Sequence, residues 1–248
     1  MSYIFHLIFY KPLYNLLILM IWALPWLDVG VLVVLFTILV KVILFPVSQK
    51  AARTQVMMKE LQVEMDEIKK KYQGNKQEEA VQTMALYKRK GVNPFSSILL
   101  VLIQLPIIFA LYYIFFKGGL PNLDHNYLYS YIPTPEHIKM TFLGFLDITK
   151  PNLILAILTA VSQYVQISIT MPPAKKKDDK PAGERSFGDE LSRSMSFQMK
   201  YILPIFIFIG AMNLPAVVSI YWVTSNLFAI GQELYIRKNL NKEKENIK

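Results

Sequence analysis

The chain has 248 residues, no cysteine, 53% hydrophobic residues and a mean hydropathy of +0.32. This hydrophobicity is high for a water-soluble domain and is gathered in long blocks, which indicates a membrane protein with several spans. The absence of cysteine excludes disulfides and cysteine-based metal sites. The net charge of +9 matters mainly through its distribution, because the Lys and Arg content of the loops sets membrane orientation.

Residues 1–28 are predicted to form an external segment in which a helix at 13–24 lies in the membrane interface. Lys11 and Pro12 are expected to split the apolar run at 3–27 into pieces too short to span a bilayer. A signal peptide is not favoured, because no basic stretch precedes this run and no small-residue cleavage site follows it.

Five membrane-spanning helices are predicted from runs with little or no charge. They cover 29–47, 95–116, 153–171, 199–212 and 214–236. The last two share a charge-free block, 201–232, which at about 1.5 Å per residue is too long for one span of a core about 30 Å thick. The sequence NLP at 213–215 provides the break between them.

Basic residues alternate between the loops and set the orientation. Residues 48–94 contain ten Lys and Arg, 172–200 contain seven, and the tail after Tyr235 contains five. In contrast, the neutral loop at 117–152 contains three, and the segment before Val29 contains one. We therefore predict an all-α, polytopic protein with the N-terminus outside, a basic cytoplasmic loop at 172–198 and a basic cytoplasmic tail at 237–248.

Residues 48–94 are predicted to form a cytoplasmic helical hairpin. Apolar side chains recur at helical spacing from Met57 to Tyr72, the sequence QGNK at 73–76 indicates a turn, and a second stripe starts at Ala80. The hairpin is either a solvated spacer or a docking arm for a client chain or a lipid surface, and periodicity alone does not choose between them.

Catalytic chemistry is not favoured by the residues available. His6, His125 and His137 lie outside the predicted spans, and no acidic residue occurs within 95–116, 153–171 or 201–232. A carboxylate pair, a metal site or a serine–histidine pair at membrane depth therefore lacks its residues. No glycine-rich phosphate loop is present either, so we expect neither an enzyme nor a cofactor.

Polar side chains inside the predicted spans are the informative ones. They are Thr37 and Lys41 in the first span, Gln104 in the second, Ser162, Gln163, Gln166 and Ser168 in the third, and Ser219, Thr224, Ser225 and Asn226 in the fifth. Taken singly, each hydroxyl or amide is expected to hydrogen-bond one membrane helix to another rather than to bind a substrate.

Lys41 is different, because a lysine inside the bilayer costs about 2.5–3.5 kcal/mol unless it is paired or hydrated. The nearest candidate carboxylate is Glu233, at the inner end of the fifth predicted span. Lys41 lies six residues before Val47, so its side chain either snorkels to the cytoplasmic headgroups or lines a water-filled cavity. Thr37 lies one helical turn away on the same face.

Four stretches resemble landmarks of the YidC-type membrane-protein insertases and follow the same order. They are PLYNLL at 12–17, LVKVILFPVS at 39–48, LYKRKGVNPFSSILLVLIQLPIIFALYYIFF at 86–116 and SIYWVTSNLFAIGQ at 219–232. The resemblance covers nearly the whole chain and is to the short form of the family, without the large external domain. It implies a five-helix core in the bacterial plasma (inner) membrane, with a hydrophilic groove open to the cytoplasm and the lipid.

The resemblance also implies which residues line that groove. The implied positions are Lys41, Thr37, Gln104, Gln166 (or Gln163) and Trp222, and we expect Ser225 in the same groove. The family places an arginine where this chain has Lys41. Lysine keeps the charge but lacks the planar fork of arginine, so we expect attraction by charge rather than two-point binding.

The predicted function is a membrane-protein insertase and chaperone whose clients are newly made membrane proteins with acidic translocated tails. The basic loop and tail are expected to approach the ribosome, and the resemblance implies contact with the Sec translocon and the signal-recognition pathway. No small-molecule substrate is expected. Two rival hypotheses remain: a small anion transporter or channel that uses Lys41, and an assembly chaperone whose main surface is the hairpin.

Overall fold

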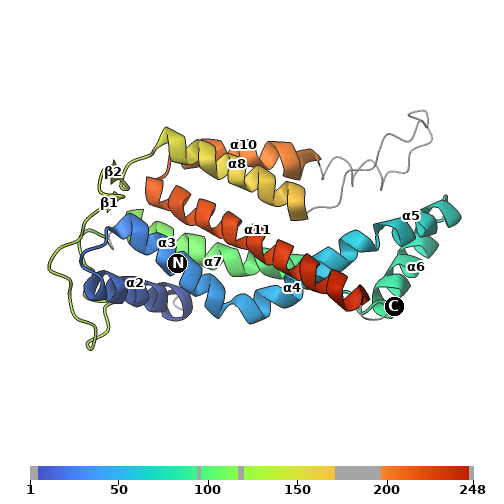
Figure 1. Ribbon diagram of the computed structural model, residues 1–248, viewed down its shortest axis with the longest axis horizontal. Helices are drawn as coiled ribbons and strands as arrows, with labels where there is room; N and C mark the ends of the chain where they lie inside the picture. The colour runs from blue at the N-terminus through green and yellow to red at the C-terminus, as the bar shows by residue number, and fades with distance from the viewer. Residues whose placement is uncertain (1–4, 94–95, 117–119, 171–196, 246–248) are drawn as a thin grey trace. The chain divides into compact units, whose positions relative to one another are not determined.

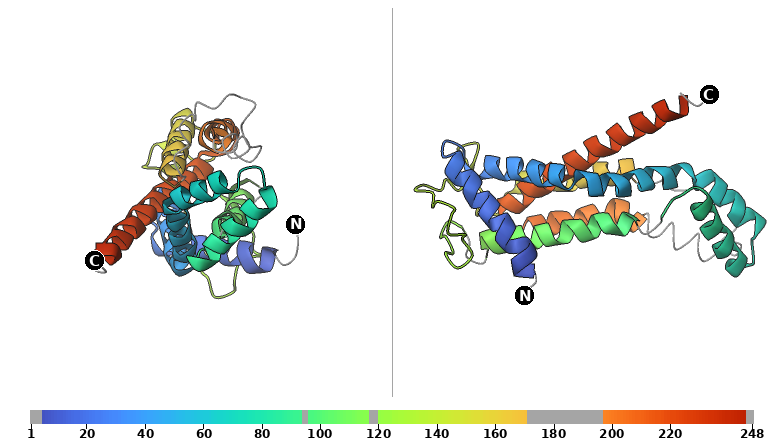
Figure 2. Two further views of the ribbon diagram at one scale, coloured as in Figure 1. Left: turned by 90° about the vertical axis from the view of Figure 1, so that its right-hand side faces the viewer. Right: turned by 90° about the horizontal axis from the view of Figure 1, so that it is seen from below.

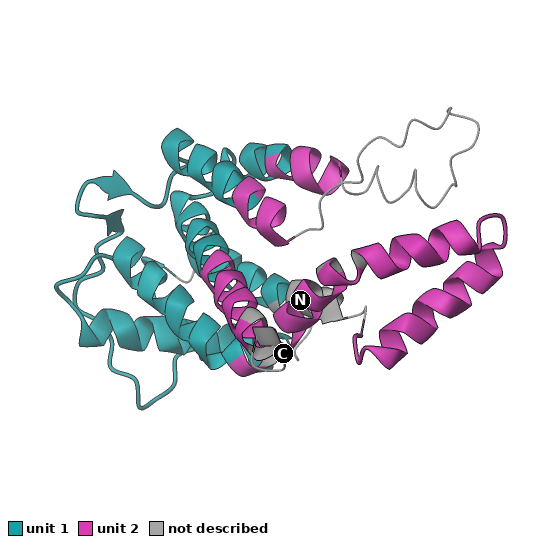
Figure 3. Cartoon of the chain, turned by 45° about the vertical axis from the view of Figure 1, so that its right-hand side comes forward, with its two compact units in different colours: residues 1–45, 101–163, 205–228 teal, residues 46–100, 164–204, 229–248 magenta. Residues whose placement is uncertain are grey.

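The computed structural model describes residues 5–93, 96–116, 120–170 and 197–245 (Figure 1). In chain order its elements are the π-helical turn His6–Tyr10, α2 (Lys11–Ala23), α3 (Val29–Ile43), α4 (Phe45–Glu60), α5 (Gln62–Lys71), α6 (Lys76–Arg89), α7 (Ser96–Phe116), β1 (Thr141–Phe142), β2 (Leu146–Asp147), α8 (Leu153–Thr170), the π-helical turn Gln198–Ile202, α10 (Leu203–Ala211) and α11 (Ala216–Glu245). The chain forms two compact units (Figure 3). The first comprises 1–45, 101–163 and 205–228, and the second 46–100, 164–204 and 229–248.

Within the described residues, 5–23 form one continuous helix, so the predicted split at Lys11 and Pro12 is wrong. The π-helical turn leads directly into α2, and the Lys11 N–H bonds to the carbonyl of His6, five residues back. This wider turn leaves room for the Pro12 ring, which clashes with the preceding turn of a regular helix. In the view from below, α2 runs obliquely to α3 (Figure 2). Its interfacial position remains a prediction.

Two segments of the described chain are long and apolar enough to cross a membrane, His6–Ala23 and Leu153–Thr170. A third such segment results if α3 and the helical residues Ser48–Met58 of α4 are taken together as one broken span. The apolar segments Gln104–Phe115 and Gln198–Ala211 are shorter. The five-span topology therefore stays a prediction, and most of the predicted loop at 172–198 lies outside the described residues.

Helix α3 ends at Ile43, before the end of the predicted first span at residue 47, and α4 begins at Phe45. Pro46 explains the break. It has no N–H to continue the hydrogen-bond ladder of α3, whereas the first turn of a new helix requires no such bond. The break leaves Lys41 in the last turn of α3.

One apolar core holds the first unit together, with contributions from α2, α3, α7 and α11. Its fully buried residues include Tyr14, Leu17, Ile18, Leu32, Phe36, Leu111, Ile114 and Tyr221. The opposite face of α3 exposes further large apolar side chains, among them Leu35, Ile38, Leu39 and Val42. A helix that is apolar on both faces is typical of a membrane segment.

The segment 120–150 belongs to the first unit and contains a pair of short strands that the all-α prediction missed. β1 and β2 pair antiparallel. Asn15 of α2 holds another part of this segment, because its amide donates to the Tyr127 carbonyl at 2.7 Å and accepts the Tyr129 N–H at 2.7 Å. The segment is thus tied to the helices by its backbone, which no apolar pattern in the sequence reveals.

Replacing Gly30 with alanine is expected to destabilise the first unit. A Cβ atom at Gly30 would lie 2.5 Å from the Cβ and 2.8 Å from the Cα of Phe142 on β1, so backbone must move. We expect a loss of about 1–3 kcal/mol, as for other overpacked sites. Thermal unfolding in lipid nanodiscs measures it, with Gly210→Ala as the matched control, because nothing lies within 4 Å of a Cβ there. Equal melting temperatures for the two variants would contradict this prediction.

In the second unit, α5 and α6 lie side by side (Figure 3) and are joined by a turn at 72–75. Glu64 on α5 pairs with Lys90, just after α6, at 2.6 Å. The Tyr87 hydroxyl donates to the sulfur of Met65 at 3.2 Å. Burial of Tyr87 raises the pKa of its hydroxyl, which moves deprotonation of this hydrogen-bond donor further above neutral pH.

Helix α4 packs against the C-terminal part of α11 in the same unit. Ala52, Val56, Ile236 and Leu240 form a small buried cluster between them, and the Gln232 amide donates to the Ser48 hydroxyl at 3.0 Å. The apolar stripe predicted from Met57 to Tyr72 belongs to two helices, because the chain turns at Leu61 between α4 and α5.

Candidate functional site

Lys41 is hydrogen-bonded to a neutral amide within the first unit. Its ammonium Nζ donates to Oε1 of Gln104 on α7 at 2.7 Å. A hydrogen bond from a charged donor is stronger than a neutral one, and it replaces part of the hydration that the ammonium loses beside apolar helices. Because the acceptor is uncharged, the pair keeps a net positive charge.

The same amide continues the connection to a third helix. Nε2 of Gln104 donates to the hydroxyl oxygen of Tyr221 on α11 at 2.5 Å. Tyr221 is only 1% exposed, so its ring is fixed in the core while its hydroxyl orients the amide. Lys41, Gln104 and Tyr221 thus form a hydrogen-bonded chain across α3, α7 and α11, which we call the Lys41 relay.

Tyr221 is absent from the residues predicted for the groove. It directly precedes Trp222, which is predicted, and it lies one turn before Ser225 on the same helix. A tyrosine in an apolar helix resembles an ordinary core aromatic, so the sequence carries only a weak signal for its role. Its position beside the landmark SIYWVTSN is that signal.

Thr37 and Ser225 are both buried, one on α3 and one on α11. The Thr37 hydroxyl donates to the Val33 carbonyl of its own helix at 2.6 Å. Such a bond satisfies the hydroxyl locally, so Thr37 lies near Lys41 without bonding to it in this arrangement.

A second polar contact joins α11 to α8. The Trp222 indole N–H donates to Oε1 of Gln163 at 3.1 Å, and the Asn226 amide donates to the Ser162 hydroxyl at 3.1 Å. The two helices are thus held together by side-chain hydrogen bonds as well as by packing. Gln166, the other candidate in the third predicted span, belongs to the second unit.

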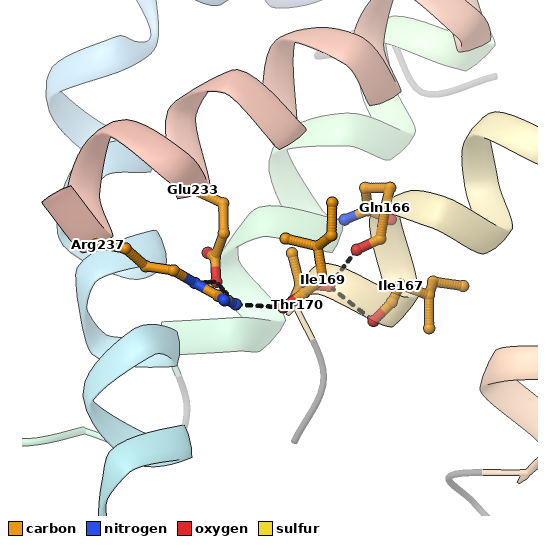
Figure 4. Close-up of polar contacts among 6 residues, drawn as sticks. All are labelled: Gln166, Ile167, Ile169, Thr170, Glu233 and Arg237. Atoms are coloured by element: carbon orange, nitrogen blue, oxygen red, sulfur yellow. Dashed lines mark hydrogen bonds and ion pairs between the residues drawn. The ribbon is translucent and has the colours of Figure 1, made fainter. Parts of the chain in front are cut away.

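Glu233, suggested by the sequence as the nearest partner for Lys41, pairs with another cation. Arg237, one turn later on α11, donates from Nη2 to its carboxylate at 2.7 Å and from Nε at 3.0 Å (Figure 4). The same guanidinium donates to the Ile169 carbonyl near the end of α8. Glu233 is 1% exposed, so a buried carboxylate here has a basic partner on its own helix.

A pocket of about 290 Å³ lies between α7 and the start of α11. Its lining is apolar and aromatic and comprises Ile108, Phe109, Tyr112, Tyr113, Leu214 and Val218. None of the predicted groove residues lines it. Within the described part of the chain, no three His, Asp or Glu side chains are grouped as a metal site requires.

Comparison with known proteins gives the family. The sequence profile of the family described as 60Kd inner membrane protein matches residues 23–244. The membrane protein insertase YidC of Clostridium tetani is 30% identical over 217 residues, which are 88% of this chain and 85% of that protein. The membrane protein insertase MisCA of Bacillus subtilis is 31% identical over 212 residues, which are 84% of this chain and 70% of that protein.

A solved structure agrees at the level of the fold. The crystal structure of an active YidC insertase with its first transmembrane domain resolved gives a TM-score of 0.55 at 24% identity, over 89% of this chain and 45% of that chain. The predicted resemblance is confirmed. Because the profile covers most of its length, the chain belongs to the 60Kd inner membrane protein family, to which the YidC-type insertases belong.

Proposed function

We propose that this protein is a membrane-protein insertase and chaperone that inserts newly made membrane proteins and assists their folding. Its relatives carry the name insertase. The observation that carries the proposal is the Lys41 relay, in which a cation on an apolar helix is held by neutral groups. A carboxylate partner would cancel this charge, whereas Gln104 leaves it available to an acidic client segment.

The proposed mechanism is thermodynamic rather than enzymatic, and it needs no cofactor. Lys41 attracts the acidic tail of a client into a hydrophilic groove, and the tail leaves on the outer side as the client helix enters lipid. That helix buries about 20 apolar residues. At about 25 cal/mol per Å² of apolar surface, this burial offsets the transient cost of moving a short polar tail.

The remaining predicted groove residues take supporting roles in this proposal. Gln163 and Trp222, bonded to each other, provide a second polar pair beside α11. Thr37 and Ser225 provide buried hydroxyls one helical turn from Lys41 and from Tyr221. Gln166, three residues after Gln163 on α8, stays a predicted groove residue.

The proposed topology has five spans, with the N-terminus outside the bacterial plasma membrane and the basic tail in the cytoplasm. It is supported by the alternation of basic and neutral loops. In this arrangement α5 and α6 form a cytoplasmic hairpin that captures clients, since Val63, Val81 and Met84 expose apolar side chains there. The basic loop and tail approach the ribosome, and the Sec translocon and signal-recognition pathway are further proposed partners.

Complementation tests this function. We expect the unmodified chain, expressed in a bacterial strain depleted of its own insertase, to restore insertion of a small client with an acidic external tail. Protease accessibility of that tail in spheroplasts measures insertion. If insertion stays at the depleted level while the protein is present in the membrane, the proposal is wrong. Uptake of a radiolabelled anion by vesicles that contain the purified protein would instead favour the transporter.

A further inference from the structure

The turn between β1 and β2 exposes two large apolar side chains. Leu143 is 59% exposed and Phe145 is 79% exposed, with Gly144 between them. The strand register places both beyond the last paired residues, Phe142 and Leu146, so they form the tip of the hairpin. We call residues 143–145 the hairpin tip.

Leu143 has a backbone conformation that disfavours leucine. Its φ is +55°, and it is the one non-glycine residue with positive φ in the part of the chain that the structure describes. Glycine and asparagine adopt this region at lower cost. Turn geometry therefore does not account for leucine at this position, and an apolar side chain here needs another explanation.

The hairpin tip is fixed to the first unit. The Asp28 carboxylate accepts the Val31 N–H at 2.9 Å, which caps α3, and the Gly144 N–H at 2.8 Å. Phe142 packs against Gly30 of α3 so closely that no Cβ fits between them. The hairpin tip therefore lies at the starting end of α3 rather than on a free loop.

Two of the charged side chains near the hairpin tip, Lys150 and Asp147, compensate each other. Lys150 pairs with Asp147 at 2.9 Å, and hydrogen bonds from Lys150 and Thr149 hold the pKa of Asp147 at about 2. Both groups remain charged at neutral pH and form a neutral pair. Such a pair is compatible with the headgroup region, because that region is polar and charged groups cost less free energy there than in the hydrocarbon core.

The unit that contains the hairpin tip exposes aromatic side chains of the kind found at membrane interfaces. Tyr131 and Trp26, in the same unit, are largely exposed, and such aromatic residues concentrate at the level of the headgroups. Figure 1 shows the strands beside the starting end of α8. From that end, α8 exposes one continuous apolar face of Leu153, Ile154, Ile157, Leu158 and Val161, as a lipid-facing span requires.

We propose that the hairpin tip is a lipid anchor that inserts Leu143 and Phe145 into the membrane leaflet at the starting ends of α3 and α8. In the proposed topology this is the outer leaflet. The anchor continues the lipid-facing surface of α8 and fixes the depth of this end of the first unit. It depends on membrane residence and not on insertase activity, so it stands or fails separately from the proposed function.

Fluorescence quenching in nanodiscs of phosphatidylethanolamine and phosphatidylglycerol tests the anchor, since both membrane faces are then open to solutes. The full-length Phe145→Cys variant is labelled with an environment-sensitive fluorophore, which is selective because the chain has no cysteine. We expect strong quenching by lipids that carry a spin label near the headgroup and weak quenching by iodide. A label at Lys242→Cys, exposed near the end of α11, provides the aqueous reference.

Two further variants separate lipid insertion from turn structure. Adding Leu143→Glu should lower quenching by the spin-labelled lipid at least about twofold, because a carboxylate disfavours interfacial insertion. Adding Leu143→Gly instead relieves the backbone strain but removes an apolar side chain. It should also lower quenching by the spin-labelled lipid, to a smaller extent than Leu143→Glu. If the label at position 145 is as open to iodide as the Lys242→Cys reference and is not quenched by the lipid, the anchor is refuted. A protein-docking tip would give that result, because the nanodisc contains no partner.

Discussion

Replacing Lys41 with glutamate is expected to abolish insertion of a client with an acidic tail, whereas arginine is expected to preserve it. Two opposite unit charges about 4 Å apart, such as the Lys41 ammonium and a client carboxylate, attract each other with an energy of about 4 kcal/mol at an effective dielectric constant of about 20. In Lys41→Glu the same interaction becomes a repulsion. Water in the site weakens this interaction. We therefore expect Lys41→Ala to slow insertion about tenfold, equivalent to ~1.4 kcal/mol, in a pulse-labelled protease-protection assay with matched protein levels.

The client supplies the control for this prediction. A client whose tail carries amides in place of its carboxylates should insert equally well with Lys41 and with Lys41→Ala. A client with a basic tail should be inserted better by Lys41→Glu than by the unmodified protein, because the glutamate at position 41 then attracts the positive charges of the tail. Equal effects of Lys41→Ala on acidic and neutral tails would show that the charge acts on the protein rather than on the client.

The relay gives a milder variant of the same experiment. Tyr221→Phe removes only the hydroxyl that accepts from Gln104, so the charge stays but its position is less fixed. We expect a smaller loss than with Lys41→Ala, again confined to acidic tails. Tyr235→Phe, at an exposed position on the same helix, is the matched control and should have no effect.

These residues also show how much of the site can be predicted from the sequence. Lys41 stands out because a charge inside an apolar run costs free energy unless it is paired or hydrated. The resemblance adds Gln104 to the predicted groove residues. Which groups bond to Lys41 depends on how three helices are rotated and aligned, and apolar helices with little periodicity leave this open. From the sequence, Glu233 is only the nearest candidate carboxylate, and the structure pairs it with Arg237. The sequence does not identify Tyr221.

The differences in the fold have equally local causes. Pro12 predicts a helix break, but a π-helical turn absorbs the ring and the helix continues. Strands of two residues are shorter than any alternating pattern, so β1 and β2 leave no signal. Conversely, Pro46 ends α3 earlier than the apolar run does. Proline has opposite outcomes at the two positions because backbone geometry, rather than residue type alone, decides them.

Removing the Arg237 side chain is expected to destabilise the second unit more than any other single charge removal on α11. Arg237→Ala leaves Glu233, 1% exposed, without its guanidinium, and the Ile169 carbonyl loses a donor. Breaking a buried pair costs about 3–5 kcal/mol. The Arg237 side chain is 33% exposed, so we expect the lower part of this range. Thermal unfolding in nanodiscs measures the loss.

A matched pair of variants separates burial of charge from loss of charge. Lys238→Ala removes the same charge from the next residue, which is exposed, and should change stability by less than about 0.5 kcal/mol. Glu233→Gln combined with Arg237→Ala should recover part of the loss, because a neutral amide costs less to bury than a carboxylate. An Arg237→Ala protein as stable as Lys238→Ala would mean that Glu233 finds water or another donor. If Arg237→Ala is the less stable of the two, the bonds from Arg237 contribute to holding the end of α8 on α11. The last carbonyls of a helix have no partner within the helix, so a donor from outside the helix stabilises its end.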